Sequence, residues 1–431
     1  MTIDNFNVGV IGFGTIGGGV VRILQKDKAL LKARAGIGVT LTTVADIAPQ
    51  RKEGIDYDGF EMISDASALV TDEKIHIVVE LIGGVSPARS FIETALKNRK
   101  HVVTANKELM AKHGKALIAL AKENGVNLFY EASSGGGIPI INALTSALAA
   151  NRYQKIYGIL NGTTNYILTK MFYEGADFEA VLEEAQDLGY AEADPSSDVE
   201  GHDVAYKLAI LGSIAFNCYF ENEDVYREGI TRISARDIDV AKKYGYVIKL
   251  VATGIAHGNE AVELRVHPVM VKGDHPLASV NGSFNAVYVE GENVGETMFY
   301  GRGAGELPTA SAIVGDIVTI LRGAESKTSS PTLNFGEETR RVIPMGDIES
   351  KYYLRLTVAD RAGVLAAITK SFGDHKVSIR TVEQTDHPGA SNAELVMTTH
   401  IVKEAQIQEA IREIEKLDSV EEVCSLIRID L

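Results

Sequence analysis

Cysteine is scarce in this sequence of 431 residues. The two cysteines, Cys218 and Cys424, lie far apart, and neither has a second cysteine or a histidine at zinc-finger spacing. The count therefore excludes a disulfide framework and a structural zinc site. The ten histidines form no H-x-x-x-H or H-E-x-x-H pattern, so we do not expect a catalytic transition metal either.

Basic residues are also in deficit. The chain has 43 Lys and Arg against 58 Asp and Glu, which gives a formal net charge of −15 at pH 7. Because a surface of this charge repels phosphates at long range, we expect no nucleic-acid partner and no binding to an anionic membrane. A local basic pocket for a small anion is still compatible with this balance.

Long apolar runs and a leader pattern are missing too. No stretch approaches 18 consecutive apolar residues, and the segment from Met1 to Asn7 has no basic region before an apolar core. Hydrophobic residues make up 45% and charged residues 23%, as in ordinary globular proteins. We predict a cytoplasmic protein of two or three domains, because single cores usually stop growing near ~250–300 residues.

The most informative motif that is present is a glycine-rich turn. Three glycines follow the apolar run Val8 to Ile11 in G-x-G-x-x-G spacing. The first permits a tight strand-to-helix turn, the second lets the backbone approach a pyrophosphate, and the third lets the helix press against the strand. Such a turn can also close an ordinary βα unit. The predicted dinucleotide contacts are Gly12, Phe13, Gly14, Thr15, Ile16 and Gly17.

Short apolar runs alternate with helical segments up to about residue 150, which predicts a Rossmann domain. Its second strand ends at Asp46, where an acid can bind the adenosine ribose, although a surface aspartate in a turn is the alternative. Asp46 favours NAD, but Arg51 and Lys52 follow closely and could bind the 2′-phosphate of NADP, so the preference stays open. The predicted strands are Val8 to Gly12, Val39 to Ala45, Ile75 to Glu80, His101 to Thr104 and Asn127 to Tyr130.

The rest of the chain divides into two further domains. Glycine-rich turns and β-rich runs, such as Lys249 to Ile255 and Ala261 to Val266, predict a mixed α+β domain. After a segment rich in Ser, Thr, Pro and charge, the element order from Tyr352 is βαββαβ, a ferredoxin-like unit. The predicted α/β architecture has a Rossmann domain over 1–130, an α+β catalytic and dimerisation domain over 131–322, a linker over 323–350 and the ferredoxin-like unit over 351–431.

An acid-rich loop, Gly189 to Asp203, runs into a helix that we predict over Val204 to Phe216. Asp203 and Lys207 fall one turn apart on the same helix face. Such a pair is most often a solvated bridge. Because this helix is otherwise apolar, we expect Lys207 to point into a cleft. There its amine can hold a carbonyl oxygen by charge and exchange a proton with the alcohol formed from it.

Polar residues also follow the fourth predicted Rossmann strand and occur in three later segments that are rich in small residues. Lys107 follows Thr104 at the expected edge of the nicotinamide crevice, although a lysine in this place is usually only solvated. The loop Glu131 to Pro139 can bind a hard cation through oxygen or serve as a tight hinge. Asn161 to Asn165 and Gly301 to Thr309 add donors and flexible backbone of the kind that surrounds polar ligands.

Together these segments resemble the homoserine dehydrogenase family. The resemblance covers about residues 7–322, and the C-terminal unit resembles an ACT domain, a small regulatory module of amino-acid biosynthetic enzymes. Five motifs agree in order, and Gly301 to Ala310 is a sixth. The five are Gly12 to Gly17, Val103 to Lys107, Glu131 to Pro139, Asn161 to Asn165 and Asp198 to Lys207.

The resemblance implies a reversible reduction of L-aspartate 4-semialdehyde to L-homoserine with NAD or NADP, on the route to threonine, methionine and isoleucine. It implies that Lys207 donates the proton to the aldehyde oxygen and that Lys107 lies close to nicotinamide and substrate. Glu192 and Asp203 would hold the substrate's amino group and orient the reacting centre. Further candidates are Gly162 and Thr163 for the substrate, and Asp46, Arg51, Thr104, Lys107 and Gly303 for the cofactor.

The resemblance also implies a structural sodium ion and an effector. Sodium would be held by Glu131 and by the carbonyls of Ser134, Gly136 and Ile138. In the ACT-like unit, the turn from Asp360 to Val364 opens a helix whose amides suit a carboxylate, and Asn392 lies on the strand that completes such sites in ACT pairs. We expect feedback inhibition by threonine at an interface between two such domains, and therefore a homodimer or homotetramer. The alternative is a domain that only joins subunits.

Two other functions fit parts of the sequence. A semialdehyde dehydrogenase that forms a cysteine thioester needs a cysteine in the crevice, and neither cysteine lies in a crevice motif. A non-catalytic sensor could bind a nucleotide in one domain and an amino acid in another. A sensor would not need the cluster of Glu192, Asp203 and Lys207.

Overall fold

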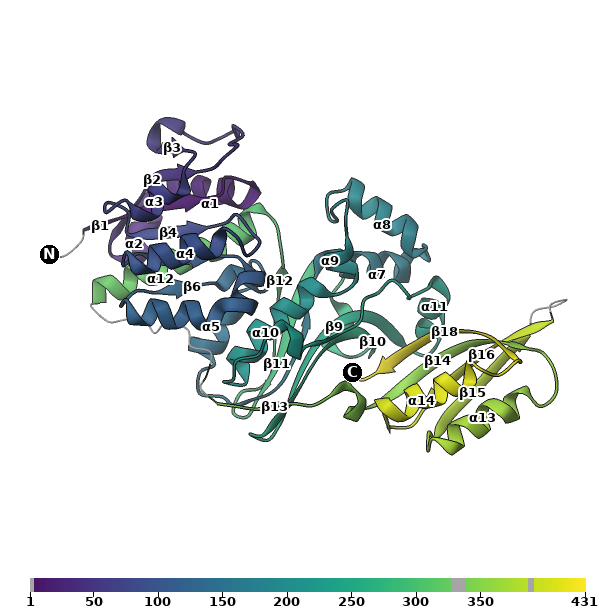
Figure 1. The fold of residues 1–431 in the computed structure, drawn as a ribbon. Helices are drawn as coiled ribbons and strands as arrows, with labels where there is room; N and C mark the ends of the chain where they lie inside the picture. The colour runs from purple at the N-terminus through teal and green to yellow at the C-terminus, as the bar shows by residue number, and fades with distance from the viewer. Residues whose placement is uncertain (1–3, 327–335, 337, 387–390) are drawn as a thin grey trace. The chain divides into compact units, whose positions relative to one another are not determined.

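The computed structural model describes residues 4–326, 336, 338–386 and 391–431, and its chain divides into two compact units (Figure 1). Unit 1 comprises Met1–Ile156, Tyr206–Asp224 and Phe284–Thr339. Unit 2 comprises Tyr157–Ala205, Val225–Ser283 and Arg340–Leu431.

Unit 1 contains a six-stranded parallel sheet in the order β3-β2-β1-β4-β5-β6. This is the strand order of a dinucleotide-binding Rossmann fold, so the predicted fold class is confirmed for this region. All five predicted strands are present, and β3 is an addition whose three residues are too few to show a period of two. The strands are β1 (Asn5–Ile11), β2 (Gly38–Ala45), β3 (Glu61–Ile63), β4 (Ile77–Glu80), β5 (His101–Thr104) and β6 (Leu128–Phe129).

Helices flank this sheet (Figure 1). Those between the strands are α1 (Thr15–Lys26), α2 (Lys28–Ala35), α3 (Ala66–Thr71), α4 (Ala88–Lys97) and α5 (Lys107–Glu123). Unit 1 also contains the short α6 (Ile140–Asn142), a π-helical turn (Ala143–Ala147) and the antiparallel pair β11 (Phe284–Gly291) and β12 (Gly295–Arg302).

The helix α12 (Glu306–Ser326) joins the core of this sheet from far along the sequence. Its apolar residues recur every three or four positions and pack in the cluster that holds β1 and α1. Within the part of the chain that the structure describes, its segment Glu306–Glu325 alone has the length and apolar composition of a membrane span. Half of that segment is buried, which is typical of a core helix. The packed residues include Ala310, Ile313, Val314, Ile317 and Leu321.

Unit 2 is built on two long antiparallel strands, β9 (Tyr246–His257) and β10 (Ala261–Lys272), which contain both of the predicted β-rich runs. Helix α10 (His202–Ala215) begins in unit 2 and ends in unit 1, and β7 (Tyr153–Ile159) also crosses the division. The other elements before the C-terminal region are α7 (Gly162–Glu174), α8 (Phe178–Asp187), α9 (Ser196–Val199), β8 (Tyr226–Arg227) and α11 (Ala235–Lys243).

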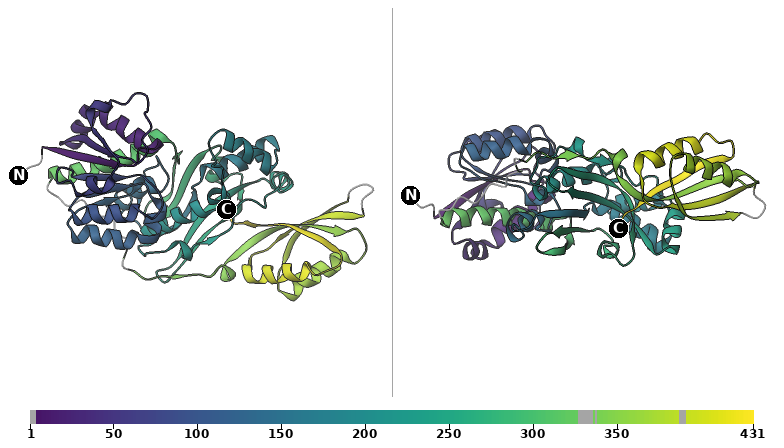
Figure 2. Two further views of the ribbon diagram at one scale, coloured as in Figure 1. Left: turned by 45° about the horizontal axis from the view of Figure 1, so that its top comes forward. Right: turned by 90° about the horizontal axis from the view of Figure 1, so that it is seen from below.

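The C-terminal region has the predicted βαββαβ order, with strands paired as β18-β14-β16-β15, here called the C-terminal sheet. Helices α13 and α14 cover one face of it (Figure 2), because alternate residues of β14, from Tyr352 to Val358, are apolar and buried against them. The elements are β14 (Glu349–Ala359), α13 (Val364–Asp374), β15 (Ile379–Asp386), β16 (Asn392–Thr399), β17 (Val402–Lys403), α14 (Glu404–Ile414) and β18 (Val420–Ile429).

The predicted linker, 323–350, lies partly outside the described residues, at 327–335 and 337. Its described part contains the end of α12, the short strand β13 (Arg341–Val342) and the start of β14. The predicted domain boundaries at residues 130, 322 and 350 stay predictions.

Candidate active site

The glycine-rich turn has the geometry that a dinucleotide requires. Gly12 adopts a φ of +96°, and a Cβ on Gly17 would lie 2.0 Å from the Gly12 carbonyl oxygen, so both positions need glycine. At Gly14 no heavy atom lies within 4 Å of the Cβ position beyond its chain neighbours. Helix α1 begins one residue later and presents its first-turn amides there. These residues fit the diphosphate of NAD or NADP.

Asp46 follows β2 and ties it to this turn. Its carboxylate accepts hydrogen bonds from the backbone N–H of Phe13 (2.6 Å) and of Ala48 (2.8 Å). Two cations lie nearby. Lys52 Cδ is 2.6 Å from the position that a Cβ on Gly18 would take, and the Arg51 guanidinium is 5.0 Å from the ring centroid of Tyr57, which lies 6.2 Å from that of Phe13 in the turn. One acidic side chain and two cationic side chains therefore lie near the glycine turn, and the preference between NAD and NADP stays open.

The ends of β4 and β5 carry a buried polar network that sequence reasoning missed. Glu80 is fully buried, and its carboxyl accepts hydrogen bonds from Thr104 Oγ1 (2.7 Å) and from the Ile82 N–H (2.8 Å). Burial raises the pKa of Glu80 above its usual value. Asn106 caps α5, whose first residue is the partly exposed Lys107. An acid at the end of an Ile-Val-Val run was the signal that could have found Glu80.

In unit 2, Asn161 joins the Asn161 to Asn165 motif to the acid-rich loop. Its Nδ2 donates to Asp198 (2.6 Å) and to the buried Asp203 (3.0 Å), while its Oδ1 caps α7 by accepting from the Thr164 N–H (2.8 Å). Thr163 donates to the Tyr190 carbonyl at 2.5 Å.

Two of the predicted substrate residues lie beside these contacts. Gly162 is the first residue of α7, so the structure brings Gly162, Thr163 and Asp203 together. Glu192 lies in the same loop with an exposed side chain, and its carbonyl accepts from Gln186 Nε2 at 3.0 Å.

Helix α10 carries both residues of the predicted acid and lysine pair. Asp203 is 2% exposed and Lys207 is 9% exposed, so the pair is not the solvated surface bridge that was the alternative. In unit 1, α5 lies beside this helix, because the Lys112 ammonium is 5.5 Å from the Tyr206 ring centroid and Tyr219 donates to the Ala111 carbonyl.

The loop from Glu131 to Pro139 has oxygen chemistry that suits a hard cation. The Glu131 carboxylate is buried and accepts from the N–H groups of Ile141 (2.8 Å) and Asn142 (2.7 Å), and burial raises its pKa to about 7. The buried hydroxyls of Ser133 and Ser134 have no hydrogen-bond partner within the described residues. The loop thus combines a buried carboxylate with two hydroxyl oxygens of the kind that could ligate a hard cation.

The same loop packs closely against the Gly301 to Thr309 segment. A Cβ on Gly136 would lie 2.2 Å from the carbonyl oxygen of Gly303, and one on Gly303 would lie 2.0 Å from Asn285 Nδ2. The Ile138 carbonyl already accepts from the Ile140 N–H at 2.8 Å. Within the described ranges, no group of three or more His, Cys, Asp or Glu residues could hold a metal ion.

Lys249 of β9 is a second residue that sequence reasoning missed. It is 1% exposed, and its ammonium donates to Asn165 Oδ1 (3.0 Å) and to the Val280 carbonyl (2.6 Å). Asn165 donates to the carbonyls of Val280 and Gly282, so the lysine supports the loop that packs on α7. Burial lowers its pKa to about 7. A single lysine inside the apolar run of β9 was the available signal.

The C-terminal sheet has its own cavity at the predicted effector turn. A cavity of about 310 Å³ is lined by residues from Val358 to Leu365 and by Gln384 and Leu395. Gly363 has a φ of +94° and precedes the first turn of α13. Asn392 donates to Glu421 at 3.0 Å.

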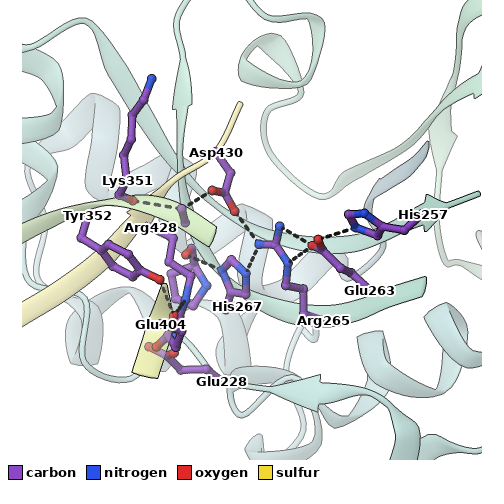
Figure 3. A network of polar contacts seen from close by, with 12 residues as sticks. Glu228, His257, Glu263, Arg265, His267, Lys351, Tyr352, Glu404, Arg428 and Asp430 are labelled. Atoms are coloured by element: carbon purple, nitrogen blue, oxygen red, sulfur yellow. Dashed lines mark hydrogen bonds and ion pairs between the residues drawn. The ribbon is translucent and has the colours of Figure 1, made fainter. Parts of the chain in front are cut away.

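A buried charge network connects the C-terminal sheet to β10 (Figure 3). Arg428 forms ion pairs with Glu404 (2.7 Å) and Glu228 (2.7 Å), and Arg265 bonds to Glu263 and to Asp430. The segment that contains Glu228 continues to Ile230, whose N–H donates to the carbonyl of Val199 in the acid-rich loop at 2.8 Å. The charged side chains of the C-terminal sheet are thus linked to the loop that ends at Asp203.

Comparison with known proteins identifies the family. The chain matches the family models of the homoserine dehydrogenase NAD binding domain over residues 12–131, of homoserine dehydrogenase over 139–318 and of the ACT domain over 352–419. The homoserine dehydrogenase of Synechocystis is 45% identical over 98% of this chain and 99% of its own length. That of Bacillus subtilis is 40% identical over 98% of each chain.

Solved structures agree with this result. The crystal structure of a homoserine dehydrogenase from Thiobacillus denitrificans has a TM-score of 0.93 at 40% identity and covers 99% of this chain and 98% of that chain. A hyperthermophilic archaeal homoserine dehydrogenase in complex with NADPH has a TM-score of 0.63 at 28% identity, and covers 77% of this chain and 100% of that chain. The chain therefore belongs to the homoserine dehydrogenase family, and it ends in an ACT domain.

Proposed function

We propose that the chain interconverts L-aspartate 4-semialdehyde and L-homoserine on the route to threonine, methionine and isoleucine, with Lys207 as the proton donor. The family assignment makes it an NAD(P)-dependent oxidoreductase that acts on a CH–OH group. The buried pair of Asp203 and Lys207 on α10 is the observation that carries the assignment of the proton donor.

The bound dinucleotide supplies a hydride to the aldehyde carbon, and the protein must stabilise the oxygen that gains the electrons. The Lys207 ammonium is suited to hold this oxygen and then to give it a proton, which leaves a neutral amine that solvent reprotonates. Asp203 lies one helical turn before Lys207 on α10 and adds a buried carboxylate to the proposed site. Lys107 is the second cation of the proposed site.

Carboxylates are proposed to bind the substrate's ammonium group. Glu192 and Asp203 belong to the acid-rich loop, and Asn161 holds Asp203 by a hydrogen bond of 3.0 Å. Gly162 and Thr163 begin α7, where backbone N–H groups face outward from the helix start and can bind the substrate's carboxylate. This division of charge suits an amino acid, which has one group of each sign.

The cofactor site is proposed to use the glycine turn, Thr104, Lys107 and Gly303. Asp46 supports NAD, because its carboxylate would repel a 2′-phosphate. Arg51 and Lys52 support NADP, and the archaeal relative was solved with NADPH.

Gly14 offers a direct test of the dinucleotide contact. Since no neighbouring heavy atom lies within 4 Å of its Cβ position, Gly14→Ala should keep the fold while its methyl group obstructs the pyrophosphate. We expect an NADH dissociation constant at least about tenfold higher than that of the unchanged chain, measured by fluorescence titration, with a melting temperature within about 2 °C. Unaltered NADH affinity in this variant would place the pyrophosphate elsewhere.

Sodium is proposed to bind at Glu131 with the carbonyls of Ser134, Gly136 and Ile138. The buried carboxylate and the unpartnered hydroxyl groups of the loop support this proposal. A structural role is expected, since the loop packs against Gly303 and can hold that segment in place.

Regulation by threonine at the ACT domain is the remaining part of the proposal. The cavity at the turn from Asp360 to Leu365 could hold the amino acid, and a second ACT domain would complete the site in a homodimer or homotetramer of a cytoplasmic enzyme. The ion pair between Arg428 and Glu228 offers a physical path from this domain to the acid-rich loop.

The proton-donor role is tested by Lys207→Ala. We expect a fall in kcat of about 100- to 10,000-fold for homoserine oxidation, followed by NADH or NADPH absorbance, with nearly unchanged cofactor affinity. Lys122→Ala, an exposed lysine at the end of α5, serves as the control and should keep full activity. Normal turnover by Lys207→Ala would exclude the proposed role, and parallel assays with and without threonine would test the regulation.

A further inference from the structure

The face of the C-terminal sheet that α13 and α14 leave uncovered lies against α11. Charged side chains on the two sides of this contact are matched. Arg355 donates to Asp237 at 2.8 Å, Arg236 forms a bidentate pair with Glu394 at 2.6–3.0 Å, and Glu383 pairs with Lys243. Three acids and three bases at this contact are therefore paired with a group of opposite sign within unit 2.

Beyond the C-terminal end of α11 this matching stops, and a cavity of about 190 Å³ lies between the uncovered face and strands β9 and β10. We call it the junction cavity. Its volume equals roughly six waters at ~30 Å³ each, enough for a small metabolite. The lining residues are Tyr244, Tyr246, Met270, Lys351, Tyr353, Arg380, Thr381, Thr398, Thr399 and Ile429.

The charge of the junction cavity is of one sign. Lys351 and Arg380 line it, and their side chains form no ion pair or hydrogen bond with any other residue that the structure describes. Figure 3 shows that the Lys351 side chain points away from the buried charge network of Arg428 and Asp430. None of the named lining residues is acidic. Two cations that have no partner of opposite charge among the described residues therefore border one cavity, in a chain whose net charge is −15.

The rest of the lining is suited to an apolar group. Met270 is 2% exposed, and Ile429 and the tyrosine rings supply further apolar surface. The hydroxyl groups of Thr381 and Thr398, which also line the cavity, bond to each other at 2.6 Å. A bare inorganic ion would leave the apolar surface without contact, whereas an organic anion would use both parts of the cavity.

We propose that the junction cavity binds a small carboxylate that has a short apolar chain and no ammonium group. Arg380 can hold a carboxylate through two parallel N–H donors, and Lys351 adds a second charge. A free amino acid suits the cavity less well, because its ammonium group would meet these cations and no carboxylate among the lining residues, while the nearby carboxylates of Glu383 and Asp237 already accept hydrogen bonds from Tyr244 and Tyr353. The site is distinct from the cavity at Asp360 to Leu365, with which it shares no lining residue.

An occupant would contact two parts of unit 2 at once. It would touch Lys351 and Arg380 of the C-terminal sheet and Tyr246 and Met270 of the long strands. Because a ligand stabilises the arrangement that binds it, such an anion would favour the docked position of the ACT domain.

Calorimetric titration of the full chain with butyrate, butylamine and inorganic phosphate tests the proposal. We expect butyrate to bind, phosphate to bind at least about tenfold more weakly, and butylamine to give no binding heat. The double variant Lys351→Gln/Arg380→Gln should weaken butyrate binding at least about tenfold, since both charge-assisted contacts are lost. Lys416→Gln, an exposed lysine of the same domain, is the matched control and should bind as the unchanged chain does.

A second variant guards against misfolding of the first. Thr381 is exposed, so Thr381→Glu should fold normally and place a carboxylate beside the two cations. Its loss of butyrate binding, with an unchanged circular dichroism spectrum, would support the site. The proposal is overturned if the unchanged chain does not bind butyrate, if phosphate binds equally well, or if both cavity variants keep full affinity. None of these readouts depends on dehydrogenase activity.

Discussion

The two units of the chain bury charged side chains in different ways. In unit 1 the buried acids Glu80 and Glu131 accept hydrogen bonds from neutral donors, and burial raises the pKa of both. In unit 2 the buried Glu404 is paired with Arg428. Burial alone would raise the pKa of Glu404, but its bonds to Arg428 bring it below the usual value.

A buried carboxyl group can serve two different purposes, depending on whether neutral donors or an arginine hold it. A carboxyl group held by neutral donors can change its protonation state or meet a cation at modest cost, which suits a nucleotide and substrate site. An acid paired with arginine keeps its charge, and it fixes the segments that carry the two partners. Unit 1 therefore has adaptable acids in the region that also contains the glycine turn, and unit 2 has fixed pairs where the ACT domain meets β10.

The largest effect should come from breaking the network in unit 2. Arg428→Met leaves Glu404 buried without its cation, and Glu228 also loses its partner. We expect the free energy of unfolding to fall by about 3–5 kcal/mol, measured by urea denaturation. Arg412→Met, on the exposed surface of α14, is the control and should change stability by less than about 0.5 kcal/mol. A loss below about 1 kcal/mol in Arg428→Met would remove the distinction between the units.

Lys249 is a buried charge of unit 2 that is held by neutral groups, and it gives the second prediction. Its pKa is lowered from 10.5 to about 7 by burial, so the unfolded chain binds more protons between those two values. Stability should therefore rise as pH increases from about 7 towards 10.5, and the penalty for the buried charge is fully present below pH 7.

The shift in the pKa of Lys249 corresponds to a rise in stability on the order of 5 kcal/mol between pH 7 and pH 10.5. Urea denaturation at pH 7 and pH 9.5 should show a smaller rise with pH in Lys249→Met than in the unchanged chain. Lys243→Met, an exposed lysine on α11, is the control and should keep the original pH dependence. Parallel curves for the unchanged chain and Lys249→Met would show that Lys249 titrates as an ordinary lysine.

The smallest effect should come from Glu80→Gln in unit 1. Because the carboxyl group is held by neutral donors and its pKa is already raised, removal of the charge should change the free energy of unfolding by less than about 1 kcal/mol. The measurement is urea denaturation at pH 7. A loss of more than about 3 kcal/mol would mean that Glu80 is a fixed charge like Glu404, and the comparison would fail.

The sequence predicted elements with strong local patterns well. The five Rossmann strands, the βαββαβ order and the glycine turn follow from apolar periodicity and from backbone requirements within a few residues of each other. The strand β3 was not predicted, because three residues have no measurable period. Neither was the packing of α12 into the Rossmann core, since that contact joins segments about 300 residues apart.

The candidate site shows the same limit. The motifs named Asp203 and Lys207, but their burial is a property of what packs around α10. Glu80 and Lys249 belong to strands that look ordinary in sequence, and they gain importance only from partners such as Thr104 and Asn165.

The sequence by itself determined the family, the dinucleotide turn and the order of the secondary structure, because these depend on residue types at short fixed spacings. Tertiary structure alone decided which charges are matched. The pairing of Arg428 with Glu228 joins residues 200 positions apart. Lys351 and Arg380, which have no ion-pair partner in the part of the chain that the structure describes, line one cavity because β14 and β15 belong to the same sheet. Whether a charged side chain forms an ion pair depends on which groups lie near it in space, and the packing of the whole fold sets those neighbours.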